Sequence, residues 1–227
     1  MSFEFVIFDL DNTLYPRGSG VMEEIGRRIQ VWVRDRLNLS WEEATELRQQ
    51  YLRRYGTTMG GLMAEHGEEV SHYLSFVHDV PIEDYLEPDP ALAEMLAQIP
   101  LRKVVYTNAT SEHGLRVLRT LGVADQFERV IGIQEVGLRN KVSRKAYERM
   151  LALLDGEAGA CIMVEDTPRN LPAAKALGMT TILVEPDEDR ELGDVPEYCI
   201  DFTVETVLEV GTVIDQILDA DERGEDG

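Results

Sequence analysis

The sequence has few cysteines, few basic residues and no long apolar run. Cys161 and Cys199 are its two cysteines, and both lie in apolar, strand-like surroundings where a reduced, buried thiol is usual. No apolar run reaches the ~18 residues that a membrane-spanning helix needs, and no basic region precedes an apolar stretch at the N-terminus. These absences predict a cytoplasmic protein with no membrane partner.

Positive charge is scarce throughout the chain. The sequence holds 22 Lys and Arg against 43 Asp and Glu, a formal net charge of -21. Nucleic-acid polymers and anionic membranes are bound through basic patches, so this balance excludes both as partners. An anionic small molecule would also be repelled at long range, and a site for one therefore needs a local cluster of basic side chains or a metal.

Short apolar runs alternate with amphipathic helical patterns over much of the 227 residues. The apolar runs predict strands, which we place at residues 3–8, 103–106, 129–133, 160–164, 180–184 and 200–202. The helical patterns lie at residues 91–97, 112–121, 143–154 and 168–177. Continuous apolar strands separated by helices are typical of a parallel sheet covered on both faces. The sequence therefore predicts an α/β fold with a doubly wound, Rossmann-like parallel sheet.

The alternation stops between residues 22 and 78, where the pattern is helical throughout. Four helices are expected there, at residues 22–37, 41–55, 59–66 and 69–77. We predict an inserted helical cap at 17–83, a catalytic core at 1–16 and 84–218, and an acidic flexible tail at 219–227.

Polar residues follow several of the predicted strands. They are Asp9 and Asp11, Thr107 and Asn108, Glu165 and Asp166, and, in the loop after 129–133, Lys141. Ligands of open parallel sheets collect beyond the carboxyl ends of the strands, so these groups are expected to meet. Carboxylates, an ammonium group, a hydroxyl and free backbone amides are what phosphoryl transfer requires.

The carboxylates suggest a covalent mechanism that depends on magnesium. Asp9 is the candidate nucleophile, and attack on a phosphate needs a cation to offset the repulsion between two anions. Mg²⁺ prefers oxygen ligands, and Asp9 with Asp166 is the natural pair. Asp11 is expected to add its backbone carbonyl, and Glu165 to support the metal site from outside.

The other groups receive roles around the phosphate. The Asp11 side chain is the candidate general acid, and then the base for the hydrolytic water. Lys141 would hold the phosphate against the nucleophile, while the Thr107 hydroxyl and the Asn108 backbone amide bind phosphate oxygens. Arg169 is expected to add positive charge beside them.

Four segments carry a resemblance to a known family. They are Asp9-Leu-Asp-Asn-Thr-Leu-Tyr15, Tyr106-Thr-Asn108, Lys141, and Val164-Glu-Asp-Thr-Pro-Arg-Asn170. In wording, order and strand context they resemble the motifs of the haloacid dehalogenase-like hydrolase superfamily. The resemblance covers residues 3–184 and implies the same core fold, nucleophile, acid and Mg²⁺, with a helical cap after the first motif. The segments 15–16, 84–90 and 168–170 look most like pyrimidine 5'-nucleotidases.

One departure from the family pattern concerns the lysine. Lys141 is followed by Val142 where relatives often have proline, and Lys145 lies one helical turn later. Both lysines are therefore kept as candidates.

The predicted function is Mg²⁺-dependent hydrolysis of a small phosphorylated metabolite, such as a nucleoside 5'-monophosphate, by a monomer or homodimer. Alternatives within the superfamily are a sugar-phosphate or phosphoglycolate phosphatase, a phosphomutase and a haloacid dehalogenase. A dehalogenase would need neither magnesium nor an acid for its leaving group. Outside enzymes, a receiver-like signalling module also combines carboxylates, Thr and Lys on a doubly wound sheet, but has no use for a helical cap.

Overall fold

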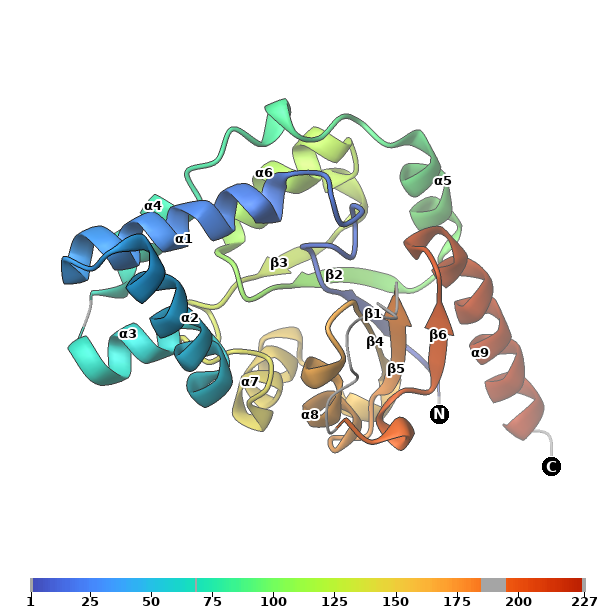
Figure 1. Ribbon diagram of the computed structural model, residues 1–227. Helices are drawn as coiled ribbons and strands as arrows, with labels where there is room; N and C mark the ends of the chain where they lie inside the picture. Colours follow the sequence, from blue (N-terminus) through green and yellow to red (C-terminus); the bar gives the residue numbers. More distant parts are fainter. Residues whose placement is uncertain (1, 68, 185–194, 226–227) are drawn as a thin grey trace. The chain divides into compact units, whose positions relative to one another are not determined.

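A six-stranded parallel sheet forms the centre of the structure (Figure 1). The computed structural model describes residues 2–67, 69–184 and 195–225. The strands are β1 (Phe5–Phe8), β2 (Arg102–Tyr106), β3 (Arg129–Ile131), β4 (Cys161–Glu165), β5 (Thr180–Val184) and β6 (Phe202–Val204). Their order in the sheet is β3-β2-β1-β4-β5-β6, with every neighbouring pair parallel. The predicted doubly wound α/β fold is confirmed.

Helices cover both faces of this sheet, which explains why its central strands are apolar without alternation. All four residues of β1 and all five of β4 are buried. One face packs on α7 (Arg144–Leu154) and α8 (Leu171–Lys175), where Tyr147 and Met150 lie among the strand side chains. The other face carries α5 (Pro90–Gln98), α6 (Ser111–Leu121) and α9 (Val210–Glu225) (Figure 1).

The helix ends follow local capping chemistry. The Asp89 side chain accepts hydrogen bonds from the first backbone N–H groups of α5, and Pro90 occupies the first turn, where its missing N–H is harmless. Thr110 caps α6 in the same way, and Gly122 ends it in a left-handed conformation. Short 3-10 turns η2 (Ala124–Gln126), η3 (Ala158–Ala160), η4 (Pro168–Asn170), η5 (Glu197–Cys199) and η6 (Val207–Glu209) complete this part of the chain.

The structure corrects three expectations from the sequence. Residues 168–177 do not form one helix: the turn η4 precedes the short α8, because prolines at 168 and 172 lack the N–H that a continuous ladder needs. The last strand runs from Phe202 to Val204 instead of ending at 202. The flexible tail expected from residue 219 is wrong up to Glu225, because α9 continues through that residue, and residues 226–227 lie outside the described chain.

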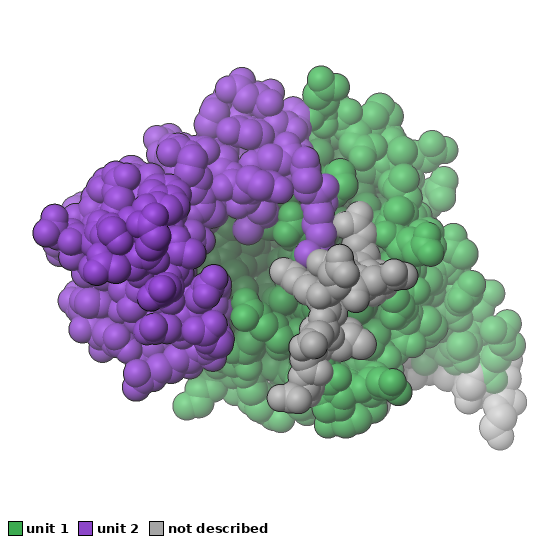
Figure 2. Space-filling model, in the orientation of Figure 1, with its two compact units in different colours: residues 1–16, 87–227 green, residues 17–86 purple. Residues whose placement is uncertain are grey.

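The chain divides into two compact units (Figure 2). Unit 1 comprises residues 1–16 and 87–227 and contains the sheet; unit 2 comprises residues 17–86. Unit 2 contains α1 (Val21–Leu37), α2 (Trp41–Tyr55), α3 (Thr58–His66), α4 (Val70–Val77) and the turn η1 (Ile82–Asp84). Trp32 of α1 packs against the Tyr73 and Phe76 rings of α4, with ring centroids 5.8 and 5.3 Å away. None of the helices formed by the described residues is both long and apolar enough to cross a membrane.

Candidate functional site

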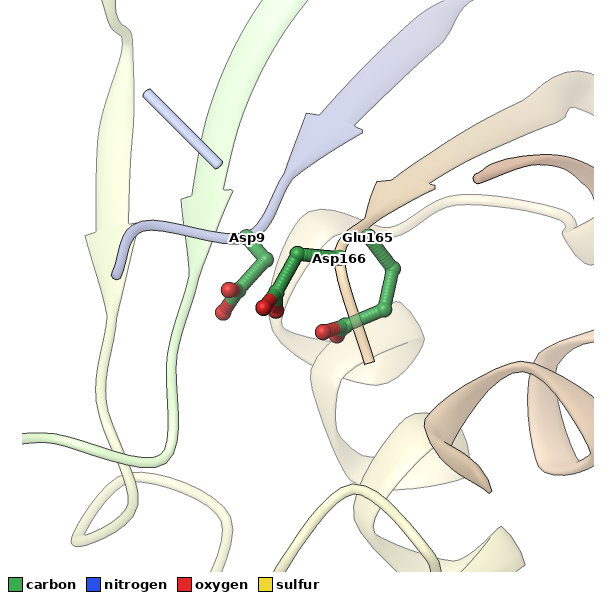
Figure 3. Close-up of side chains that lie close together, drawn as sticks. All are labelled: Asp9, Glu165 and Asp166. Carbon is green, nitrogen blue, oxygen red and sulfur yellow. The ribbon is translucent and has the colours of Figure 1, made fainter. Parts of the chain in front are cut away.

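Three buried carboxylates meet where β1 and β4 end. Asp9 directly follows β1, Glu165 is the last residue of β4, and Asp166 comes next. Phe8 pairs with Val164 in parallel register, and the Asp9 N–H donates to the Val164 carbonyl at 2.8 Å, so the two strand ends lie side by side. One oxygen from each carboxylate lies within 4.8 Å of the others, and Figure 3 shows the three carboxylate groups close together beyond the ends of the two strands.

A buried lysine joins two of these carboxylates. The Lys141 ammonium group contacts Asp9 Oδ1 and donates to Glu165 Oε2 at 2.8 Å, and its side chain is fully buried. Its nitrogen also lies 5.2 Å from the centre of the Tyr106 ring. Lys145, by contrast, is exposed on α7. The structure therefore brings Lys141, of the two candidate lysines, to the carboxylates.

Burial and crowding perturb the ionisation of this cluster. Burial, and then the Glu165 carboxylate, raise the pKa of Asp9 to about 7 against the opposing effect of Lys141. Burial likewise raises the pKa of Glu165 to about 7, while Lys141 lowers it. Burial alone would lower the pKa of Lys141, but the Asp9 and Glu165 charges outweigh it and raise that pKa. Two carboxylates thus share one ammonium group, with Asp166 beside them.

The donor set fits a hard divalent cation. Carboxylate oxygens are the ligands that Mg²⁺ and Ca²⁺ prefer, and the excess of buried negative charge favours a cation here. Glu165 is also tied on both oxygens, since Oε2 accepts from Lys141 and Oε1 accepts from the Thr167 N–H at 3.1 Å. This arrangement suits the supporting position predicted for Glu165.

The Asp11 carboxylate has a separate set of partners. Its Oδ1 accepts from the Tyr15 hydroxyl at 2.7 Å and lies 3.1 Å from His113 Nε2. Burial, and then the Asp11 charge, raise the pKa of Tyr15 well above its ordinary value, so the phenol stays protonated. Within the described chain, the group of three clustered carboxylates does not include Asp11.

The predicted phosphate ligands lie in two places. Thr107 directly follows β2 and is buried, and its hydroxyl accepts from the Ala109 N–H at 2.9 Å. The Asn108 side chain accepts from the Lys141 N–H at 3.0 Å, which connects the loop after β2 to the lysine segment. Arg169 lies exposed in η4. The phosphate-binding roles of all three stay predictions.

Sequence reasoning assigned no role to three residues that touch the aspartates. The Thr13 hydroxyl donates to Asp9 Oδ2 at 3.2 Å, and Tyr15 and His113 reach Asp11. Thr13 and Tyr15 each lie four residues after their aspartate in a loop whose Leu14 N–H bonds back to the Leu10 carbonyl, as in a helical turn. The four-residue spacing could have indicated from the sequence that Thr13 and Tyr15 contact the two aspartates. His113 is 102 residues from Asp11, and no local pattern links them.

Comparison with known proteins agrees with this architecture. A phosphatase of the haloacid dehalogenase-like type from Thermococcus onnurineus has a similar structure, with a TM-score of 0.63 and 20% identity over 93% of this chain and 98% of that one. Ribulose-1,5-bisphosphate 5-phosphatase of Halopiger xanaduensis is 27% identical over 82% of this chain and 86% of its own. Phosphate metabolism protein 8 of Saccharomyces cerevisiae is 31% identical over 53% of this chain, a match that spans 40% of the yeast protein.

The family model matches residues 3–178, which include Asp9, Thr107, Lys141 and Asp166. The sheet order, the carboxylate cluster and this match agree, and the chain belongs to the haloacid dehalogenase-like hydrolase family.

Proposed function

We propose that this protein is a Mg²⁺-dependent phosphomonoesterase that forms an aspartyl-phosphate on Asp9. The observation that carries the proposal is the buried group of Asp9, Glu165 and Asp166, of which Asp9 and Glu165 contact the ammonium group of Lys141. Nucleophilic attack on a phosphate needs an anionic nucleophile, a fixed positive charge beside it and ligands for a hard metal ion. Phosphatases among the relatives support the same chemistry.

The first step forms the covalent intermediate. An Asp9 oxygen attacks phosphorus while the bond from phosphorus to the ester oxygen breaks, and the Asp11 carboxylic acid gives its proton to the departing oxygen. Lys141 holds the nucleophile and neutralises charge on the phosphate. In the second step, water attacks phosphorus, Asp11 takes a proton from that water, and the bond from Asp9 to phosphorus breaks to release inorganic phosphate.

The metal would be held by Asp9 and Asp166, with Glu165 in support and the Asp11 backbone carbonyl as a further oxygen ligand. When bound, Mg²⁺ supplies positive charge that offsets repulsion between the nucleophile and the phosphate oxygens. Thr107 and Asn108, at the loop between β2 and α6, would bind the remaining phosphate oxygens.

Two substrate classes are favoured by specific observations. The segments at 15–16, 84–90 and 168–170 resemble pyrimidine 5'-nucleotidases, which favours nucleoside 5'-monophosphates. The Halopiger xanaduensis relative, matched over 82% of this chain, is named for a sugar bisphosphate and favours phosphorylated sugars. We assign the choice between such esters to the inserted helical unit 2, which is the predicted cap. We place the enzyme in the cytoplasm.

The test is phosphate release from a panel of nucleoside monophosphates and sugar phosphates, measured with Mg²⁺ and with a chelator. We expect release that needs Mg²⁺ and is lost in Asp9→Asn, with acid-quenched wild type retaining labelled phosphate on Asp9. Absence of release from every ester, with halide released from 2-haloacids instead, would overturn the proposal in favour of a dehalogenase. Recovery of an isomeric phosphate ester in place of inorganic phosphate would indicate a phosphomutase.

A further inference from the structure

We propose that Tyr15 and His113 are positioning residues that together fix the orientation of the Asp11 carboxylate. This inference rests on the proposed function, in which Asp11 protonates the leaving oxygen. It adds a reason for two buried polar side chains that the reaction itself does not otherwise use.

Both contacts converge on one atom of Asp11. The Tyr15 hydroxyl donates to Oδ1 at 2.7 Å, and His113 Nε2 lies 3.1 Å from the same oxygen. In the ionised form of Asp11 this oxygen can only accept, so Nε2 then carries the hydrogen of the pair. Together the two contacts restrain the position and the orientation of the carboxylate.

The two donors are themselves held by the backbone. Tyr15 is 2% exposed, and it ends the turn in which the Leu14 N–H bonds to the Leu10 carbonyl. His113 is 1% exposed and lies in the first turn of α6, where its N–H donates to the capping Thr110 hydroxyl at 3.1 Å. Neither side chain can swing away without leaving a buried polar group unsatisfied.

The neighbouring glycine holds α6 close to the sheet. A Cβ added at Gly114 would lie 2.7 Å from Val130 Cγ1 and 3.7 Å from Leu10 Cδ2, so this turn of α6 packs directly on β3 and on the loop after β1. His113 therefore lies on a helix that cannot move away from the sheet without losing these packing contacts. The carboxylate plane of Asp11 is fixed by two donors that come from separate, packed parts of unit 1.

Positioning of a general acid has a distinctive kinetic consequence. A strongly basic alkoxide leaves only when protonated, whereas p-nitrophenolate leaves readily without a proton. A misplaced Asp11 should therefore slow the first step, formation of the aspartyl-phosphate, from alkyl phosphates and leave that step nearly unaffected for p-nitrophenyl phosphate. The second step is common to both esters and does not distinguish them. A general loss of folding or metal binding would slow both esters alike.

The experiment compares the single-turnover rate of aspartyl-phosphate formation from glycerol phosphate and from p-nitrophenyl phosphate in Tyr15→Phe, His113→Leu and His113→Gln at saturating Mg²⁺. Tyr15→Phe and His113→Leu should lower this rate with the alkyl ester by about 10- to 100-fold, part of the ~10²- to 10⁴-fold that a general acid contributes. They should lower it with the aryl ester less than about 3-fold. His113→Gln, which keeps an N–H near the Nε2 position, should recover most of the loss.

The control is Thr181→Val, which removes a buried hydroxyl that donates to the Cys199 carbonyl at 2.9 Å, elsewhere in unit 1. Thr181→Val should lower Tm without changing the ratio of the two rates of aspartyl-phosphate formation. If Tyr15→Phe and His113→Leu slow aspartyl-phosphate formation from both esters equally while the wild type is active, positioning is overturned and the proposed function stands. If the wild type hydrolyses neither these esters nor the wider panel, the proposed function fails and the inference falls with it.

Discussion

The side-chain oxygen of Asn108 accepts a hydrogen bond from the backbone N–H of Lys141, at 3.0 Å. Asn108 follows β2, and Lys141 lies in the connection after β3, so this bond ties two loops at the same edge of the sheet. The lysine that enters the carboxylate cluster is thereby located by its backbone as well as by its charge.

Lys141→Met should abolish most of the activity. Loss of a fixed charge beside a reacting group costs about 10²- to 10³-fold in kcat, and the same change leaves the buried Asp9 and Glu165 without their ammonium. The unfolding free energy of the metal-free protein should fall by about 3 kcal/mol or more at pH 8. Lys145→Met, at an exposed position, is the matched control and should change neither quantity. Inactivation by the second variant alone would reverse the assignment.

Magnesium should bind with measurable affinity and raise the Tm of the wild type, because a ligand that binds only the folded state stabilises it. Asp166→Asn removes one of the clustered carboxylates and should weaken binding at least about tenfold in isothermal titration calorimetry. Asp125→Asn changes the net charge equally at an exposed position and should bind as the wild type does. Equal affinities in the two variants would exclude Asp166 as a ligand.

The metal-free protein should lose stability as pH rises from 5 to 8. The pKa of Asp9 and that of Glu165 are about 7 in the folded protein, against ~4 for unfolded acids, so the folded state binds more protons in this window. Each such group lowers the unfolding free energy by up to ~1.4 kcal/mol per pH unit. Asp9→Asn should flatten this dependence, and Asp125→Asn should run parallel to the wild type. Curves for Asp9→Asn and the wild type that stay parallel would contradict the raised pKa.

Gly132→Ala should destabilise the fold strongly. An added Cβ would lie 2.4 Å from the Ser111 backbone nitrogen and 2.8 Å from the Ala109 carbonyl oxygen, and backbone atoms cannot step aside. We expect a cost of about 2 kcal/mol or more in urea unfolding. Gly211→Ala meets only the flexible Met95 side chain, at 3.3 Å, and should stay within about 1 kcal/mol of the wild type. A similar loss of unfolding free energy in both variants would show that the backbone of residues 109–111 can move to accommodate the added Cβ.

The strands and the carboxylates that follow them were predictable because both depend on short stretches of sequence. An apolar run such as 161–164 buries both of its faces, and it ends where the charged pair Glu165-Asp166 begins. Parallel pairing then brings Asp9 and Asp166 to one edge whatever the helices do. The prolines at 168 and 172 were equally visible, but how they divide a helical pattern into η4 and α8 depends on packing.

Other features depend on the folded chain. The sequence favoured Lys141 and left Lys145 as an alternative, and only the course of the chain after β3 buries the first and exposes the second. His113 lies in a turn of α6 that reads as a surface helix pattern, yet it is 1% exposed. The sequence at the end of α9 predicts an acidic tail because charged residues dominate it. The helix is anchored by Ile214 and Ile217, which are buried in the core before that segment.

Unit 2 is spliced into the chain between Pro16 and Glu87, while all the side chains to which we assign a chemical step belong to unit 1. The groups to which we assign the reaction and the segment to which we assign substrate choice therefore lie in two different compact units of one polypeptide. Residues 17–86 can diverge, or be exchanged for another helical insert, without deleting a single one of those groups. Under the proposed function, one set of reacting groups can in this way serve different phosphorylated metabolites.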